Sequence, residues 1–203
     1  MAKDRNILLE VKKLIFQYGI KSLTMDDISQ HLGISKKTLY LEVENKADLI
    51  DKLIEQVINE QETEFCEVAD KPGLNAIDEL LEIYRCNAVM AKTINPSLLY
   101  ELKKYYPSSY ERLDEFRWGF AFKSIIANLE KGISNGLYRS DLNIQIVARL
   151  YTSRILEIFN SGLFPPDQFP PALILREMFT YHIRGIASTE GIHYLEHKTV
   201  IDF

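Results

Sequence analysis

Residues 24–49, TMDDISQHLGISKKTLYLEVENKADL, contain the pattern that decides the fold. Thr24 precedes a helical run and Asp27 follows three residues later, which is the spacing of a capping box. Gly33 ends this run, because glycine adopts the left-handed conformation that closes a helix. Ser35 is a cap for a second short helix. The stretch therefore predicts two short helices joined by a tight turn, the layout of a helix-turn-helix.

The apolar residues of this stretch lie where two packed helices need them. Ile28 and Leu32 form the inner face of the first short helix, and Leu39 lies on the inner face of the second. Asn45, with Asp48 three residues later, then caps a long helix. These positions predict a small core that holds the two short helices together.

Helical periodicity continues on both sides of the motif. Leu8, Val11 and Ile15 share one face of an earlier helix, which Gly19 ends. Further apolar stripes follow residue 73, and a last long helix is expected over about 172–187. No alternating strand pattern appears. The sequence predicts an all-α protein of about nine helices.

Length and composition limit the class of protein. The chain has 203 residues, of which 46% are hydrophobic and 26% charged, as in ordinary globular proteins. Its longest stretch without a charged residue, 158–166, is much shorter than the roughly 20 residues of a membrane helix. No signal-peptide pattern is present, and two cysteines do not form a disulfide framework. We expect a soluble, cytoplasmic protein that does not contact membranes.

The charge is distributed unevenly along the chain. The net charge is −5, which by itself argues mildly against a nucleic-acid-binding protein. Residues 1–50, however, hold eight Lys/Arg and seven Asp/Glu, so the acidity belongs to the rest of the chain. The N-terminal quarter can therefore bind DNA through a few lysines.

The second short helix has the residues of a DNA-recognition helix. Lys36, Lys37 and Thr38 lie at its start, where side chains reach base edges and phosphates. Lys46 begins the next helix, a second place where a cation can meet the DNA backbone. The residues alone thus indicate a DNA contact around positions 35–46.

In combination these residues resemble the TetR/AcrR family of transcriptional regulators. The resemblance covers about the first 55 residues and rests on Thr24, Ile28, Gly33-Ile34-Ser35, Thr38-Leu39-Tyr40, Asn45-Lys46 and Leu49. It implies an all-α chain with a helix-turn-helix DNA-binding domain at 1–49. A helical effector-binding and dimerisation domain would follow at 50–203.

The resemblance also implies a function and a set of partners. The protein is expected to be a repressor that binds a palindromic double-stranded DNA operator as a homodimer and is released by a small-molecule effector. The dimer would form through helices near 143–160 and 172–188. The expected operator contacts are Thr24, Ser35, Lys36, Lys37, Thr38, Tyr40 and Lys46.

The resemblance is incomplete directly after Tyr40. Leu41 and Glu42 stand where the family has aromatic or basic residues. Leu41 cannot donate a hydrogen bond to a phosphate, and Glu42 repels one if it faces the DNA. A regulator-like helical dimer that has lost DNA binding, and acts through a ligand or a protein partner, therefore stays open as an alternative.

Aromatic residues at helical spacings are candidates for an effector pocket. An apolar cavity between helices is a common way to hold a small molecule, although aromatic residues also fill ordinary cores. The candidates for the pocket are Tyr84, Tyr100, Trp118, Phe122 and Tyr151.

The sequence contains little that indicates catalysis. His193 to His197 match the HxxEH pattern of one metalloprotease group, but only six residues follow, so no distant carboxylate can complete a zinc site. No nucleophile–base pair or phosphate-binding loop is apparent. We expect no enzyme activity, no catalytic residue, no cofactor and no metal.

Overall fold

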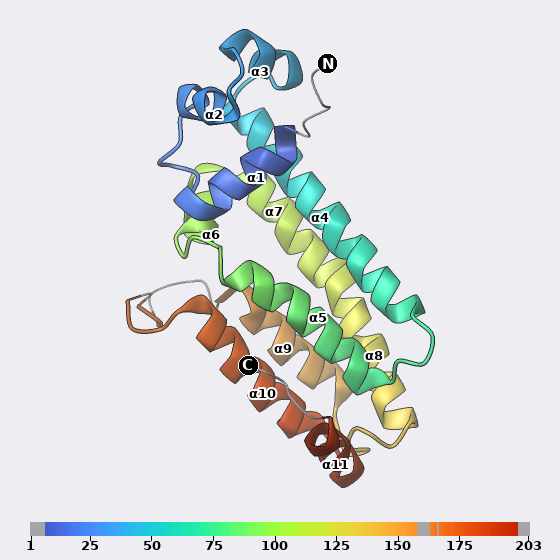
Figure 1. Cartoon of the computed structure of the whole chain (residues 1–203). Helices are drawn as coiled ribbons and strands as arrows, with labels where there is room; N and C mark the ends of the chain where they lie inside the picture. Colours follow the sequence, from blue (N-terminus) through green and yellow to red (C-terminus); the bar gives the residue numbers. More distant parts are fainter. Residues whose placement is uncertain (1–6, 158–162, 166, 199–203) are drawn as a thin grey trace.

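The computed structural model describes residues 7–157, 163–165 and 167–198 of the chain. Within these residues the regular elements are helical, as the sequence predicted (Figure 1). One isolated bridge joins Tyr138 to Ala187. The N-terminal end contains α1 (Ile7–Tyr18), α2 (Met25–Leu32) and α3 (Lys36–Glu42). The long helix α4 (Lys46–Asp70) leads from this end into the rest of the molecule.

The helix boundaries at the N-terminal end follow the predicted capping residues. The hydroxyl of Thr24 accepts a hydrogen bond from the backbone amide of Asp27, and the carboxylate of Asp27 accepts one from the backbone amide of Thr24. The capping box is therefore present. Gly33 ends α2 with a φ of 64°, in the left-handed region. Ser35 and Asn45 cap α3 and α4 through their side chains. The prediction of two short helices joined by a tight turn is confirmed.

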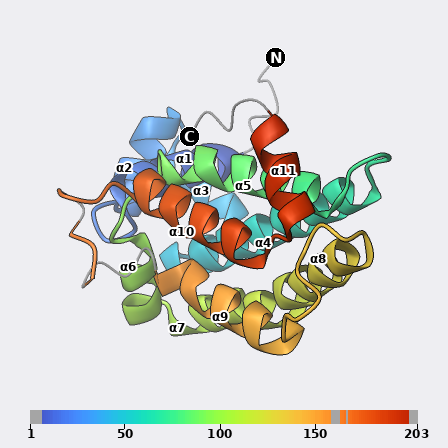
Figure 2. The ribbon, with the colours of Figure 1, turned by 90° about the horizontal axis from the view of Figure 1, so that it is seen from below.

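The body of the molecule is a second group of helices (Figure 1). It contains α5 (Ala76–Ala91), α6 (Leu98–Tyr105), α7 (Pro107–Phe116), α8 (Phe122–Ser134), α9 (Ile144–Glu157), α10 (Pro171–Ile186) and α11 (Thr189–His197). A π-helical turn, η1 (Arg117–Ala121), joins α7 to α8. Figure 2 views the body from below, where α10 lies along α5 and α9 lies along α8.

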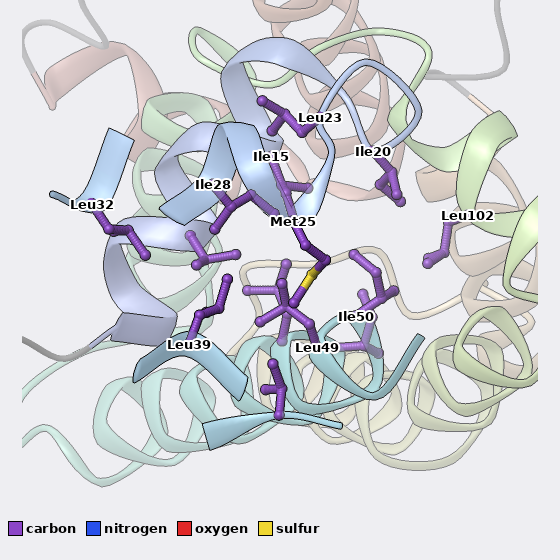
Figure 3. Close-up of a cluster of buried hydrophobic side chains, with 14 of the residues drawn as sticks. Ile15, Ile20, Leu23, Met25, Ile28, Leu32, Leu39, Leu49, Ile50 and Leu102 are labelled. Atoms are coloured by element: carbon purple, nitrogen blue, oxygen red, sulfur yellow. The ribbon is translucent and has the colours of Figure 1, made fainter. Parts of the chain in front are cut away.

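Two clusters of buried apolar residues hold the fold together. The first cluster joins α1, α2 and α3 to the start of α4 and to Leu98 and Leu102 of α6 (Figure 3). The second cluster joins α5, α8, α9 and α10 and includes Tyr84 and Phe179. Because α6 supplies side chains to the first cluster, the body and the N-terminal helices share a core.

The structure refines several boundaries expected from sequence. It has eleven α-helices in the described residues, against about nine expected, because α6 is short and α11 follows directly on α10. The helix expected near 143–160 is α9, and residues 158–160 lie outside the described residues. The helix expected over 172–188 is α10. Helix α4 continues through position 49, the expected domain boundary, and its Ile50 and Leu53 still belong to the first cluster.

The helices in the described part of the chain do not include a membrane-spanning segment. Each of its helices is too short or too polar to cross a bilayer.

Candidate DNA-binding surface and internal cavity

Helix α3, the expected recognition helix, is held in place by one buried side chain. Leu39 is fully buried in the first cluster, against Ile28 and Leu32 of α2 (Figure 3). A seven-residue helix is not stable alone, so this packing and the cap at Ser35 keep α3 helical. The opposite face of α3 is exposed and contains Lys37 and Tyr40.

The three hydroxyl groups predicted to contact DNA have structural roles at the helix ends. Thr24 Oγ1 accepts from the Asp27 amide at 3.1 Å and donates to the Asp27 carboxylate at 2.6 Å. Ser35 Oγ accepts from the Thr38 amide at 3.0 Å and lies 2.8 Å from Thr38 Oγ1. All three side chains are exposed, so each remains accessible from the α3 side.

The two lysines at the start of α3 differ in their partners. Lys36 Nζ lies 2.6 Å from Asp26 Oδ1, and this hydrogen bond raises the pKa of the lysine. Lys37 is exposed and forms no ion pair with any residue that the structure describes. Tyr40, one turn further on, is 48% exposed. Lys37 and Tyr40 are therefore both accessible on the surface of α3.

Lys46 is placed differently from the sequence expectation. Its ammonium group donates to the carbonyl oxygens of Ile20, at 2.6 Å, and of Leu23. Burial lowers its pKa, and the nearby carboxylates of Glu101 and Asp27 oppose this effect. The lysine thus points at the loop between α1 and α2 rather than out toward a phosphate, because this loop leaves carbonyls next to the start of α4.

A carboxylate from the body holds the same loop. Glu101 Oε2 of α6 accepts from the amides of Ile20, at 2.7 Å, and Lys21, at 2.8 Å. In addition, the Asn95 amide donates to the Phe16 carbonyl at 2.6 Å. The sequence analysis missed Glu101, because a glutamate on an amphipathic helix has no distinctive local pattern.

A cavity of about 510 Å³ connects the N-terminal helices with the body. Its lining is mostly aliphatic and aromatic. Ile15 and Ile50 of the first cluster line it, and so do Asn128 and Lys131 near the end of α8. Helix α1 and the end of α8 lie at opposite ends of the molecule (Figure 1), so the cavity is elongated.

The structure places the predicted pocket residues in different surroundings. Of the five aromatic candidates, Tyr151 lines the cavity. Tyr84 is stacked on Phe179 in the second cluster, with ring centres 4.3 Å apart, and Tyr100 is 52% exposed. The other two candidates, Trp118 and Phe122, also lie outside the lining, as do Tyr84 and Tyr100. Helical spacing finds a helix face, but only the packing shows which faces surround a cavity.

The polar groups of the cavity include a neutral aromatic pair. Tyr151 is stacked on His182 of α10, with ring centres 3.9 Å apart. Burial raises the pKa of Tyr151 to about 12 and lowers that of His182 to about 4. Both side chains are therefore uncharged at neutral pH.

The charged lining residues are Glu79, Lys131 and Arg117. Glu79 and Lys131 pair with each other at 2.5 Å. Arg117 of η1 donates through Nη2 to Asp114, while its buried Nε has no hydrogen-bond partner among the described residues. The sequence analysis did not single out Arg117, which differs from its apolar neighbours in the lining, Phe116 and Phe120.

Comparison with known proteins agrees with this geometry. Residues 7–53 match the sequence model of the family described as "Bacterial regulatory proteins, tetR family". The chain is also 27% identical over 190 residues to the HTH-type transcriptional regulator YvaF of Bacillus subtilis (strain 168). This alignment covers 92% of the present chain and 97% of YvaF.

Solved structures share the fold at low sequence identity. The regulator FadR of Bacillus subtilis, in complex with stearoyl-CoA, has a TM-score of 0.62 and 16% identity, over 89% of this chain and 97% of FadR. The choline complex of a Saccharomonospora viridis protein has a TM-score of 0.67 and 14% identity, over 90% of this chain and 96% of the other. The capped helix-turn-helix and its match to the family model show that residues 7–53 belong to the tetR family of bacterial regulatory proteins, and the similarity to YvaF supports a TetR family transcriptional regulator over the rest of the chain.

Proposed function

We propose that this regulator is a repressor that binds a palindromic operator as a homodimer and releases it when a small molecule occupies the cavity. The observation that carries the proposal is the position of the cavity. Its wall includes Ile15 and Ile50, which also pack in the core under α2 and α3. A ligand in this cavity therefore contacts the same core that supports the recognition helix.

In this proposal the DNA contacts come from the exposed side of α3 and from its neighbouring caps. Lys37 and Tyr40 reach the DNA backbone directly, and Lys36 exchanges Asp26 for a phosphate. Thr24, Ser35 and Thr38 add hydroxyl contacts from the helix ends. Lys46 acts indirectly, by holding the loop that precedes α2.

The proposed dimer uses α9 and α10, and their exposed apolar residues support it. Ile146 and Leu150 of α9 are 55% and 54% exposed, and Tyr181 of α10 is 77% exposed. Apolar side chains of this size are typically covered in a homodimer. With a partner subunit, the two α3 helices would have to lie about 34–36 Å apart to enter successive major grooves.

Release by a ligand requires a path from the cavity to α2 and α3. Helix α6 contributes Leu98 and Leu102 to the cavity wall, and its Glu101 holds the loop between α1 and α2. A ligand that displaces α6 therefore moves the loop that begins the helix-turn-helix. The ligand shifts the equilibrium between the DNA-binding state and the released state only to the extent that its affinities for these two states differ.

The ligand is expected to follow the chemistry of this particular cavity. FadR and the Saccharomonospora viridis protein hold stearoyl-CoA and choline, which differ in charge and size. A cavity of about 510 Å³ lies within the usual range for small-molecule sites.

The test of the DNA-binding function is a mobility-shift titration with the DNA upstream of the gene for this protein. Binding should weaken steeply as salt rises, because phosphate contacts release counterions. The double variant Lys36→Ala/Lys37→Ala should bind more weakly and with a smaller salt slope. The matched control, Lys92→Ala/Lys123→Ala, removes the same charge from exposed sites of the body and should bind like the unmodified protein.

The same titration distinguishes the alternative function. Leu41 is 76% exposed and Glu42 is exposed beside it, and neither favours a phosphate. If the unmodified protein shifts no DNA at low salt, the repressor proposal is wrong and a regulator-like dimer without DNA binding is favoured.

A further inference from the structure

Arg117 occupies a position where the helix pattern calls for an apolar residue. The lining residues Leu113, Phe116, Phe120 and Ala121 surround it at helical spacing along α7 and η1. Largely buried arginines are rare unless they are paired, and Arg117 pairs with Asp114 three residues earlier. Breaks of a local pattern of this kind are typical of functional positions.

The surroundings of Arg117 leave part of its hydrogen-bonding capacity unused. Its side chain is 14% exposed, and Nη2 donates to the Asp114 carboxylate. The buried Nε has no hydrogen-bond partner among the described residues. A guanidinium has five N–H donors, and an unsatisfied buried donor is unusual in a native protein. The π-helical turn around Arg117 is a second unusual feature, because such turns are frequent at functional sites.

The other polar groups of the cavity do not balance this cation. Glu79 and Lys131 neutralise each other, and Asp114 is not part of the cavity lining. Tyr151 and His182 are stacked on each other and carry no charge at neutral pH. Arg117 is therefore the one charged residue of the described lining without a partner in that lining, and Asp114 pairs with it from outside the cavity.

We propose that the cavity binds an elongated amphipathic anion. Its carboxylate or phosphate head accepts hydrogen bonds from Arg117, and its apolar tail lies among the side chains of α4, α5 and α8. This inference rests on the proposed role of the cavity as the effector site and adds the chemical class of the effector. The guanidinium suits either head group, since it pairs with carboxylates and phosphates in the same planar geometry.

Trp118 provides a local reporter for the test. It is the single tryptophan of the chain, and the guanidinium carbon of Arg117 lies 5.2 Å from its ring centre. The full-length protein, without DNA, is titrated with palmitate, cetyl phosphate and cetyl alcohol, which share an apolar chain and differ in the head group. Trp118 fluorescence and calorimetry follow binding in parallel. We expect the dissociation constants of the two anions to be at least about tenfold lower than that of the alcohol. A hydrogen bond to a charged group contributes enough free energy for such a difference.

Variants assign this preference to Arg117. Arg117→Gln should remove the advantage of the anions and leave the affinity for cetyl alcohol unchanged, while Arg117→Lys should keep part of it. Asp114→Asn should tighten anion binding, because it frees the guanidinium. The control is Arg112→Gln, which removes a cation of α7 that pairs with Glu55 outside the cavity lining.

Two results would overturn the inference. One is equal affinity of the unmodified protein for the alcohol and both anions, including no binding of any of them. The other is an anion preference that survives in Arg117→Gln or, if that variant does not fold, an anion affinity that Asp114→Asn leaves unchanged. The titrations contain no DNA, so a failed mobility shift does not affect them. Anion binding that leaves an operator complex intact would contradict only the proposed release.

Discussion

At the scale of single residues, two side chains of opposite charge hold the loop between α1 and α2. Lys46 donates to the carbonyls of Ile20 and Leu23, and Glu101 accepts from the amides of Ile20 and Lys21. Backbone groups in a loop need such partners when they are withdrawn from water. Because Glu101 belongs to the body, this loop is also a link between the cavity and the helix-turn-helix.

The variant Glu101→Gln tests this link. It keeps one carbonyl acceptor but replaces charge-assisted hydrogen bonds with neutral ones. We expect the free energy of unfolding to fall by about 1 kcal/mol, which urea denaturation measures. Operator affinity should fall as well, because the loop positions the start of α2. Glu111→Gln, an exposed glutamate of α7, is the control and should change neither quantity.

At the scale of elements, helix α11 is attached to the body through a buried carboxylate. Asp78 of α5 accepts from the Tyr194 hydroxyl of α11, at 2.9 Å, and from Lys198 directly after it. Burial opposes the ionisation of Asp78, but the hydrogen bonds from Lys198 and Tyr194 outweigh it and hold its pKa below the usual 3.8. The charged form of Asp78 is therefore the one that the folded protein favours.

This predicts a loss of stability in acid. Since the pKa of Asp78 is lower in the folded than in the unfolded chain, its contribution is present above about pH 4 and disappears as the pH falls toward the folded value. Urea denaturation from neutral pH down to about pH 3 should show a steeper loss for the unmodified protein than for Asp78→Asn. Asp70→Asn, at an exposed carboxylate at the end of α4, should follow the unmodified protein. Parallel curves for all three proteins would contradict the role of Asp78.

At the scale of the whole molecule, the apolar surface of α9 and α10 bears on the oligomeric state. Leu150 and Tyr181 are large, exposed and on different helices. We expect light scattering to give twice the chain mass of 23.5 kDa for the unmodified protein. The double variant Leu150→Asp/Tyr181→Asp should give the mass of one chain, because burying two carboxylates in an apolar interface is costly.

A control for this experiment lies on another helix. Val89 of α5 is 69% exposed, and Val89→Asp should leave the dimer intact. An unmodified protein with the mass of one chain would contradict the proposed dimer, and a dimeric double variant would place the interface elsewhere.

The parts of the fold that could be predicted from sequence depend on local interactions. Thr24, Gly33, Ser35 and Asn45 end or begin helices through contacts within a few residues, so their spacing was sufficient. The parts that could not be predicted depend on distant segments. Arg117, for example, differs from an ordinary surface arginine because the residues around it line a cavity.

The sequence by itself thus determined the helical class, the helix-turn-helix and its residues, since capping and periodicity depend on residues that are close together in the chain. Only the tertiary structure decided that Lys46 points inward, that Glu101 holds the α1–α2 loop, and that Tyr151 lines the cavity while four other aromatic candidates do not. The physical reason is that a helix has the same periodic pattern whichever neighbour covers it. Which side chains meet in a cavity is settled by packing between helices far apart in the chain.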